Sequence, residues 1–330
     1  MEKTVHYLET HSQNPYYNLA FEEYVLCHRT QGDYLLLWQN DNTIVVGRNQ
    51  NTEAEINRAF VEEHHINVVR RGTGGGAVYH DLGNLNYSFI TDVGDDGISI
   101  RRFTQPVVAA LRSLGLNAEA SGRNDILVEG RKVSGTAQRR HAGRILHHGT
   151  LLFDANPGMV AGALNVDPEK FRSKSTKSVR ARIGNIRDFL PVDMDLPVFW
   201  AYLKDALSGG GLTPDALTAD ELAAVERLKT EKYDTWAWNY GRSPKFDVTR
   251  KRYWDGGCLE ANVSIADGRI TDVKFYGDFL AVRGMEELLA ALKGAAYRPE
   301  AVRMVLEESP IAELFGGITT DEVMATLFDL

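Results

Sequence analysis

The sequence predicts an α+β protein made of a large N-terminal domain and a small C-terminal one. Strand-like and helix-like patterns are interspersed as far as residue 240, and a linker containing glycine and proline, GRSPK, follows at residues 241–245. Beyond it, apolar residues alternate over residues 259–265, and helical patterns fill most of the remainder. We therefore expect one domain at residues 1–245 and a second, α+β domain at residues 246–330.

The first part of the chain predicts one helix and then two strands. Asn14 followed by Pro15 is a favourable pair for the N-cap and first position of a helix, and apolar residues then recur at helical spacing as far as Tyr24. Residues 34–38 and 43–46 are strand-like, and the turn-rich segment QNDN separates them.

Two capping-box patterns predict further helices. Thr52 with Glu55 would open a helix that continues to about His64, and Thr218 with Glu221 would open a helix over residues 218–229. Between them, apolar residues at helical spacing predict helices over residues 100–114 and 197–207. Pro106 either marks the true first turn of the earlier of these two helices or kinks it.

The end of the first domain and the second domain are also readable. Trp236, Trp238 and Tyr240 alternate, which is typical of a strand or an extended segment. In the C-terminal part, Asp267 and Gly268 form a two-residue turn between two strands. Helices are then expected over residues 285–292, 299–306 and 320–328.

The most informative stretch is RRGTGGGAVYHDLGN at residues 70–84. It joins strand to strand, because residues 66–69 precede it and residues 77–79 and 85–90 are strand-like. A dinucleotide-binding loop needs a helix after the glycines, and no helical pattern follows Ala77. The pattern G-x-x-x-x-G-K-[ST] of a P-loop is absent as well.

Glycines at positions 72, 74, 75, 76 and 83 remove side chains from this loop and leave its backbone amides accessible. Arg70 and Arg71 directly precede them. Amides beside guanidinium groups suit an anion that must be approached closely, such as a phosphate or a carboxylate. A mobile glycine turn between two strands is the alternative interpretation.

A second informative stretch lies at residues 118–153. Residues 125–128 and 132–137 predict a hairpin, and the strand at residues 145–153 would lie alongside. Lys132 follows the hairpin turn and is flanked by small residues that leave room for a ligand. His147 and His148 are consecutive in a strand, so at most one of them points towards such a site.

Residues 154–187 carry many cations, among them Lys170, Arg172, Lys174 and Arg182. Two interpretations of this segment are equally open. It is either a solvated loop or a lid that closes over a phosphate.

Composition excludes several classes of function. The net charge of −8 and the pI near 5.6 argue against a general nucleic-acid or membrane-surface binder. The N-terminal residues lack the apolar core of a signal peptide, and no apolar run is long enough to cross a membrane, so the cytoplasm is the expected compartment. Cys27 and Cys258 lie far apart and predict neither a disulfide framework nor a zinc site.

The candidate site residues are mostly cationic or backbone donors. Such a set suits the attack of a carboxylate on a phosphate, in which two anions must be brought together and the charge of the transition state neutralised. Acyl-adenylate formation is a reaction of this kind. Lys132 would bridge the carboxylate and the α-phosphate, and Asp125 would be a Mg²⁺ ligand.

The stretches RRGTGGGAVYHDLGN, SGRNDILVEGRKVSGTAQ and HHGTLL, in this order and spacing, closely resemble the lipoate-protein ligases. The resemblance covers most of the chain, from NPYYNLAFEE at residues 14–23 onward. It implies a mixed β-sheet catalytic domain flanked by helices, of the kind shared with biotin ligases, and a small accessory C-terminal domain. It also implies ATP, Mg²⁺ and lipoate as ligands, and a two-step reaction through lipoyl-AMP.

The resemblance further implies roles for single positions. A lysine contacting both lipoate and nucleotide corresponds to Lys132, and residues 167–185 correspond to a loop that closes over the adenylate. The implied ATP-binding residues are Arg71, Gly76, Ala77, Val78, Tyr79 and Lys132. The implied lipoate-binding residues are Glu22, Arg71, Thr73, Gly74, Gly75, His80, Lys132, Arg139 and His148. Relatives often have Ser and Phe where this chain has Thr73 and Tyr79.

The implied acceptors are lipoyl domains of 2-oxoacid dehydrogenase E2 subunits and the glycine cleavage H protein, and we expect a monomer. Three alternatives remain. An octanoyl- or lipoyl-transferase would use a cysteine and no ATP, but neither Cys27 nor Cys258 lies near the motifs. A biotin ligase is disfavoured because the glycine loop lacks G-R-G-R-x-G. A protein that binds lipoate or a nucleotide without catalysis is the third.

Overall fold

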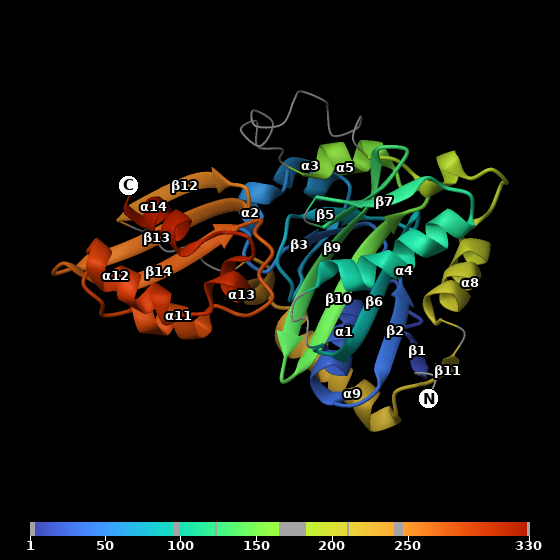
Figure 1. Cartoon of the computed structure of the whole chain (residues 1–330), viewed down its shortest axis with the longest axis horizontal. Coiled ribbons are helices and arrows are strands. Elements are labelled where there is room, and N and C mark those ends of the chain that lie inside the picture. Colours follow the sequence, from blue (N-terminus) through green and yellow to red (C-terminus); the bar gives the residue numbers. More distant parts are fainter. Residues whose placement is uncertain are drawn as a thin grey trace.

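The computed structural model describes residues 4–94, 99–122, 124–164, 183–209, 211–240 and 247–328. Its largest element is an eight-stranded sheet in the order β11-β1-β2-β6-β10-β9-β8-β7 (Figure 1). The strands are β1 (Val5–Glu9), β2 (Asp33–Trp38), β6 (Asn84–Asp92), β7 (Ala118–Ser121), β8 (Asp125–Val128), β9 (Arg131–His141), β10 (Arg144–Leu152) and β11 (Leu212–Pro214).

The sheet is mixed. β1 runs parallel to both β2 and β11, whereas the neighbours from β2 through β7 pair antiparallel. Strands β9 and β10 form a long hairpin through its middle. The expected α+β class with a mixed sheet flanked by helices is therefore confirmed.

Two helices cover one face of this sheet, namely α4 (Ile100–Ser113) and α8 (Leu196–Leu207) (Figure 1). Val107 and Leu111 of α4 and Phe199 of α8 pack onto a core that the sheet supplies. The helix α4 begins after its N-cap Ser99, and Pro106 lies inside it rather than at its first turn.

The opposite face carries α1 (Pro15–His28), α9 (Ala219–Leu228) and a second, small sheet. The side chain of Asn14 caps α1 as predicted, and Thr218 with Glu221 forms the predicted capping box of α9. The small sheet has the order β4-β3-β5 and consists of β3 (Thr43–Val46), β4 (Asn67–Arg70) and β5 (Val78–His80).

The helix expected from Thr52 to His64 is wrong in two respects. The chain forms two short helices, α2 (Thr52–Glu55) and α3 (Arg58–Glu63), and the backbone is extended at Ile56 between them. The N-cap of α2 is Asn51. The Thr52 hydroxyl does not cap the helix. It donates to the carbonyl of Asn239, which is a tertiary contact.

The alternating aromatic residues near position 238 do not form a strand. Trp236 and Trp238 lie in a short helix, α10 (Trp236–Asn239), and Tyr240 is its C-cap. This helix follows the π-helical turn η2 (Lys229–Tyr233). Further elements are α5 (Pro157–Ala163) and the 3₁₀ helix η1 (Ile186–Phe189). The predicted linker at residues 241–245 and most of the predicted loop at residues 167–185 lie outside the described residues.

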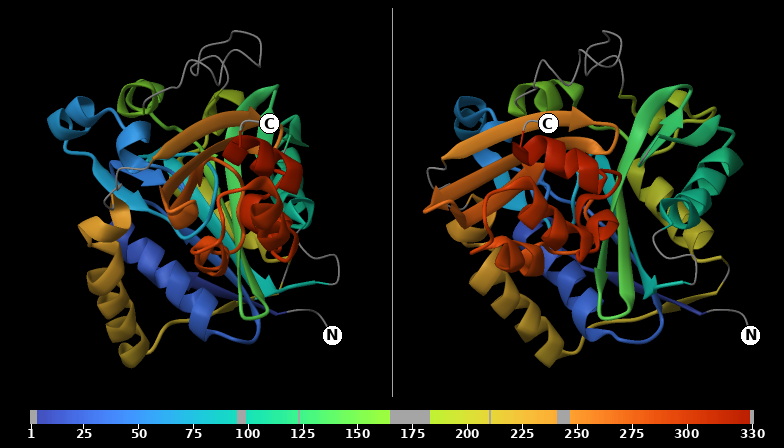
Figure 2. Two further views of the ribbon diagram at one scale, coloured as in Figure 1. Left: turned by 90° about the vertical axis from the view of Figure 1, so that its left-hand side faces the viewer. Right: turned by 60° about the vertical axis from the view of Figure 1, so that its left-hand side comes forward.

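The C-terminal unit, residues 247–328, has a core of its own that includes Leu259, Phe275 and Phe315. Helices pack on an antiparallel three-stranded sheet, which the two rotated views in Figure 2 also show. The elements are β12 (Val248–Trp254), β13 (Gly257–Ala266), β14 (Arg269–Gly277), α11 (Glu286–Leu292), α12 (Pro299–Glu307), α13 (Ile311–Phe315) and α14 (Thr320–Phe328).

The C-terminal unit contacts the rest of the chain close to the glycine loop. The amide of Gly277 donates to the Asn49 carbonyl at 2.6 Å, and that of Arg140 donates to the Val282 carbonyl at 2.8 Å. Arg140 also pairs with Glu313. Throughout the described part of the chain, no helix is long and apolar enough to cross a membrane.

Candidate active site

A pocket opens between the large sheet and the small sheet. The large sheet supplies its floor, and β3, β5 and the glycine loop between β4 and β5 supply its roof. Eight of the residues singled out from the sequence line it: Arg71, Gly75, Gly76, Ala77, Val78, His80, Lys132 and His148. Segments that are far apart in the sequence therefore meet at one place.

Lys132 faces this pocket because of a β-bulge. Lys132 and Gly135 both line the pocket, although in a regular strand residues 132 and 135 would point to opposite faces of the sheet. In β9 the register with β8 shifts, so that Ile126 pairs with Ser134 and Leu127 pairs with Lys132. Bulges beside active sites commonly redirect a side chain in this way. Val133 then points into the core, and Lys132 turns towards the pocket.

Gly135 makes room for the lysine. A Cβ atom at this position would lie 3.2 Å from Lys132 Nζ and 3.3 Å from its Cε, so the side chain of Lys132 lies over the glycine. The ammonium also contacts Asp125 Oδ1 at 2.7 Å. Lysine and carboxylate are each about one-third exposed, 37% and 35%, so a ligand entering the pocket can reach both.

Arg71 is buried beneath the glycine loop. Burial lowers its pKa to about 10, so the guanidinium stays charged at neutral pH. It donates to the carbonyls of Val45, Gly74 and Gly76 and, through Nε, to Thr73 Oγ1 at 2.9 Å. Arg71 thus fixes the shape of the loop from inside while part of its side chain lines the pocket.

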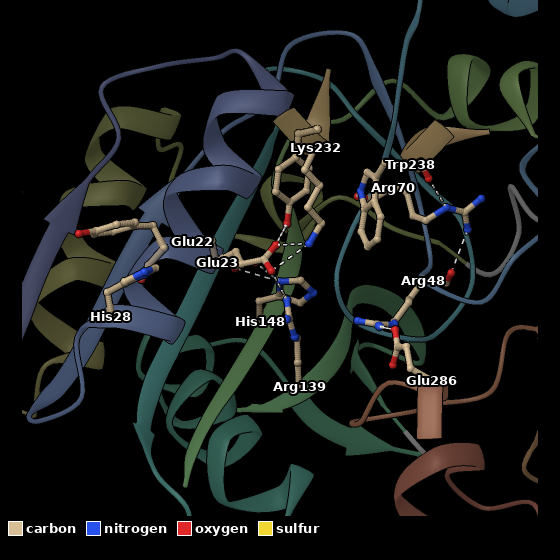
Figure 3. Close-up of polar contacts among 12 residues, drawn as sticks. Glu22, Glu23, His28, Arg48, Arg70, Arg139, His148, Lys232, Trp238 and Glu286 are labelled. Carbon is tan, nitrogen blue, oxygen red and sulfur yellow. Dashed lines mark hydrogen bonds and ion pairs between the residues drawn. The ribbon is translucent and has the colours of Figure 1, made fainter. Parts of the chain in front are cut away.

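The interpretation of Arg70 as an anion-binding group is wrong. Its guanidinium lies on the far side of β4, where it donates to carbonyls of the turn at residues 47–50 and to Thr52 Oγ1 at 2.6 Å. Figure 3 shows it turned towards Trp238, whose carbonyl accepts a further bond at 2.9 Å. These acceptors occupy the donors of Arg70, so this residue braces the loop rather than meeting a ligand.

The expectation of accessible backbone amides is wrong for Gly74, Gly75 and Gly83, the last of which donates to Asp81 Oδ1 at 2.9 Å. The amide of Gly74 donates to the Ala281 carbonyl at 3.3 Å, and that of Gly75 donates to the Phe279 carbonyl at 3.0 Å. Both acceptors belong to the C-terminal unit. Gly74 has no room for a side chain, because a Cβ atom would lie 2.6 Å from the Ala281 nitrogen. Close packing against that unit thus requires a glycine at position 74, whereas Gly75 has a φ of +90°, a backbone conformation that favours glycine.

A chain of buried polar groups connects the loop to helix α1. Thr73 Oγ1 lies 2.8 Å from His148 Nε2, and His148 Nδ1 donates to the Glu22 carboxylate at 2.9 Å. Ser88 donates to the same carboxylate and accepts from the indole N–H of Trp38 at 2.9 Å. Glu22 and Thr73 therefore act on the pocket through His148, which lines it.

Glu23, the next residue, belongs to a separate cluster, shown in Figure 3. Its carboxylate contacts Arg139 Nη1 at 3.0 Å and Lys232 Nζ at 2.6 Å, and Tyr233 donates to it. Burial raises the pKa of Glu23, but the two cations outweigh it and hold the pKa at about 2. Burial lowers the pKa of Lys232 despite its contact with Glu23.

Arg139 does not line the pocket. Its guanidinium lies against the loop, since a Cβ atom at Gly72 would come within 2.6 Å of Arg139 Nη1. Tyr79 also points away from the pocket. Its ring is buried in a core with Ile44 and Val46, and its hydroxyl donates to Asn42 Oδ1. Burial raises the pKa of Tyr79 to about 12.

The two consecutive histidines separate as expected. His148 faces the pocket, whereas His147 lies on the other face of the sheet and stacks on Phe103 with ring centroids 5.0 Å apart. His80 lies in the roof of the pocket and is 3% exposed. Burial, Arg71 and His148 lower its pKa to about 3, so the ring is neutral.

Sequence reasoning missed several residues of the pocket. Asn86 on β6 and Thr150 on β10 belong to its floor, and neither lies in a pattern that marks a binding residue. They could have been found only from the pairing of strands. Leu19, Trp38, Val45 and Asn124 also line the pocket and were not singled out, and the remaining lining residues are the small residues Gly135, Thr136, Ala137 and Gly149.

The described residues contain no group of three or more His, Cys, Asp or Glu side chains that could hold a metal by themselves. A Mg²⁺ ion bound with a nucleotide needs less, because phosphate oxygens and waters complete its shell around one or two carboxylates. Asp125 is a partly exposed carboxylate beside the pocket, so it fits this simpler arrangement.

The fold and the site define an enzyme with a pocket between two sheets. Lys132, which a β-bulge directs into the pocket, lies at its centre. The family model described as lipoyl protein ligase A/B catalytic domain matches residues 14–208, and the model described as bacterial lipoate protein ligase C-terminus matches residues 243–327. The chain belongs to the lipoate-protein ligase family, so the protein is a ligase.

Relatives match along nearly the whole chain. Lipoate-protein ligase LplJ of Bacillus subtilis is 42% identical over 96% of this chain and 97% of its own. Lipoate-protein ligase 1 of Staphylococcus aureus is 41% identical over 94% of this chain and 96% of its own. The sequence-based assignment to this family is confirmed.

Solved structures agree. P. falciparum LipL1, crystallised in complex with lipoate, shares the fold over 99% of this chain and 100% of its own, with a TM-score of 0.83 at 23% identity. The bipartite lipoate protein ligase of Thermoplasma acidophilum, solved as part of a system with its E2 lipoyl domain, covers 75% of this chain and 100% of its own with a TM-score of 0.64 at 32% identity. Lipoate-protein ligase A bound with ATP covers 73% of this chain and 99% of its own, also with a TM-score of 0.64, at 29% identity.

Proposed function

We propose that this protein activates free lipoate with ATP and transfers the lipoyl group to a lysine of an acceptor lipoyl domain. In the first step a carboxylate oxygen of lipoate attacks the α-phosphorus of ATP, and pyrophosphate leaves. In the second, the amine of the acceptor lysine attacks the acyl carbon, and AMP leaves. The observation that carries the proposal is the position of Lys132, over Gly135 and opposite the glycine loop.

Lys132 is the catalytic residue of the proposal. Its ammonium lies between the two anions, neutralises their repulsion and stabilises the negative charge that develops on the α-phosphate. Asp125, which contacts the ammonium at 2.7 Å, orients it before the ligands enter. A Mg²⁺ ion bound with the nucleotide would be held by Asp125 and would neutralise phosphate charge.

The two substrates occupy different parts of the pocket in this proposal. ATP lies along the glycine loop at Arg71 and residues 76–79, where Tyr79 contributes its backbone only, since its side chain is buried elsewhere. Lipoate lies over the floor of the large sheet. His80 and His148 border its site. Glu22 and Thr73 hold His148 in place, and Arg139 contacts the glycine loop at Gly72.

Acceptors are lipoyl domains of E2 subunits and the glycine cleavage H protein, and the enzyme acts as a monomer in the cytoplasm, where ATP is available. We place the domain boundary near residue 245. The family models, which match residues 14–208 and 243–327, and the separate core of the C-terminal unit support that boundary.

Exchange of radioactive pyrophosphate into ATP tests the first step. We expect exchange that requires lipoate, because reversal of adenylate formation is the only route by which label reaches ATP. Exchange without lipoate, or none with it, would argue against lipoyl-AMP. This assay also separates the ligase from a protein that merely binds lipoate or ATP.

A thioester-forming transferase is tested through the two cysteines. Neither lines the pocket, Cys258 is buried, and burial raises the pKa of Cys27, which makes its thiol a weak nucleophile. We expect the double variant Cys27→Ser, Cys258→Ser to modify an acceptor at a rate within about twofold of the wild type. A variant that still folds, by circular dichroism, but no longer transfers lipoate would favour the thioester route.

A further inference from the structure

Two buried nitrogen donors in the pocket lack a partner among the described residues. His80 Nδ1 accepts from Asn40 Nδ2 at 3.1 Å, so the proton of the neutral ring is on Nε2. Asn86 Oδ1 accepts from Asn84 Nδ2 at 3.1 Å, which leaves Asn86 Nδ2 unpaired. Within the part of the chain that the structure describes, neither His80 Nε2 nor Asn86 Nδ2 has a hydrogen-bond partner.

Such groups need an acceptor. His80 is 3% exposed and Asn86 is 2% exposed, and both line the pocket. Nearly all buried polar groups in folded proteins are hydrogen-bonded, because an unsatisfied one loses its hydration without compensation. Two unpaired donors in one pocket therefore indicate an acceptor on the ligand.

The distance from Lys132 identifies that part of the ligand. Across the floor of the pocket, Trp38 on β2 pairs with Asn86 on β6, and Asn86 pairs with Thr150 on β10. The amide of Gly135 on β9 donates to Thr150 Oγ1 at 3.1 Å, and Lys132 lies over Gly135. Asn86 is thus two strand spacings, about 10 Å, from the strand that carries the lysine.

Given the proposed function, the carboxylate of lipoate lies at Lys132 and its alkyl chain extends across the sheet. The pentanoate chain and the dithiolane ring span roughly two strand spacings, which brings the ring to Asn86. Trp38 is the cross-strand neighbour of Asn86, and Leu19 and Val45 belong to the same apolar cluster as Trp38 and also line the pocket. These three side chains suit the apolar body of the ring. Its sulfur atoms are weak hydrogen-bond acceptors, and sulfur also packs well against an indole.

We propose that His80 and Asn86 determine specificity, selecting a dithiolane over a plain alkyl end by donating N–H groups to its sulfur atoms. Octanoate has nearly the same length but ends in a methyl group. It would leave both donors buried and unsatisfied, and a site built to hydrogen-bond one substrate discriminates against an analogue that lacks the acceptor. The inference rests on the proposed function and concerns the end of the pocket away from the chemistry.

The test compares two acids in one variant. Asn86→Leu replaces the amide by an apolar side chain of similar size, and we expect the ratio of kcat/KM for octanoate to that for lipoate to rise about tenfold, chiefly through KM. The assay is pyrophosphate exchange that depends on lipoate or on octanoate. A loss of folded protein lowers both rates by the same factor, so it cannot by itself change the ratio.

Asn84→Leu is the matched control. It removes the same hydrogen bond between the two asparagines but leaves the Asn86 donors in the pocket, so we expect the wild-type ratio. If Asn86→Leu is inactive with both acids, Asn86→Ala is measured in the same way. An unchanged ratio in the active Asn86 variant, or an equal rise in Asn84→Leu, would overturn the inference.

The same experiment distinguishes the two levels of the account. If the wild-type protein exchanges pyrophosphate with neither acid, the proposed function itself is contradicted. If it does so with lipoate but the ratio does not depend on Asn86, the ligase proposal stands and only the role of the two donors is removed.

Discussion

Replacement of Lys132 by alanine is expected to reduce lipoate-dependent pyrophosphate exchange by at least about a hundredfold. An electrostatic donor aimed at developing charge typically contributes about 3 kcal/mol to the activation free energy, which corresponds to about that factor. The effect should appear in kcat more than in KM, because the lysine acts most strongly on the transition state.

The fold should survive this substitution. The side chain of Lys132 is 37% exposed, and it forms an ion pair with Asp125, which is 35% exposed. Pairs of this kind contribute little to stability. Arg131→Ala is a control on the neighbouring exposed position, and we expect it to keep full exchange activity. Exchange at the wild-type rate in folded Lys132→Ala would remove the lysine from the mechanism.

The second large effect concerns stability and pH. Glu23 has a pKa of about 2 in the folded protein against an ordinary value of 4.5, because Arg139 and Lys232 outweigh the cost of burial. A carboxyl group whose pKa is lowered by folding stabilises the folded state above its unfolded pKa, and this stability is lost as the pH falls towards the folded pKa. The difference corresponds to about 3 kcal/mol at pH 7.

We therefore expect Glu23→Gln to lower the free energy of unfolding by about 3 kcal/mol at pH 7, since two largely buried cations, Arg139 and Lys232, lose their partner. At pH 3.5 the wild type has already lost part of this contribution, so the gap between the two proteins should narrow by about 1.4 kcal/mol. Urea unfolding at both pH values measures it.

Glu308→Gln, at an exposed position, is the control and should change the free energy of unfolding by less than about 0.5 kcal/mol at either pH. A gap between wild type and Glu23→Gln that is constant from pH 7 to pH 3.5 would show that Glu23 does not titrate as proposed. A gap that widens would reverse the sign of the linkage.

Local signals predicted much of the architecture. The N-cap at Asn14, the capping box at Thr218 and the hairpin after Val128 depend on residues near one another in the sequence, and the structure contains all three. The capping-box pattern at Thr52 misled because its hydroxyl bonds to the distant residues Arg70 and Asn239 instead. Tertiary contacts overrode a local preference there.

The candidate site was predictable in its motifs but not in its geometry. The pattern of the hairpin singles out Lys132, yet only the bulge in β9 turns it towards the pocket, and no residue type specifies that bulge. The sequence likewise could not separate Arg70 from Arg71, which are adjacent but point in different directions. Asn86 became visible only through the pairing of β2, β6 and β10.

The mass of an acceptor lipoyl domain tests the central claim most directly. The purified protein is incubated with ATP, Mg²⁺, lipoate and the unmodified domain, and the domain is weighed by mass spectrometry. The account predicts a gain of one lipoyl group on one lysine, and no gain when ATP is omitted. A domain that stays unmodified, or one that is modified equally well without ATP, would contradict it.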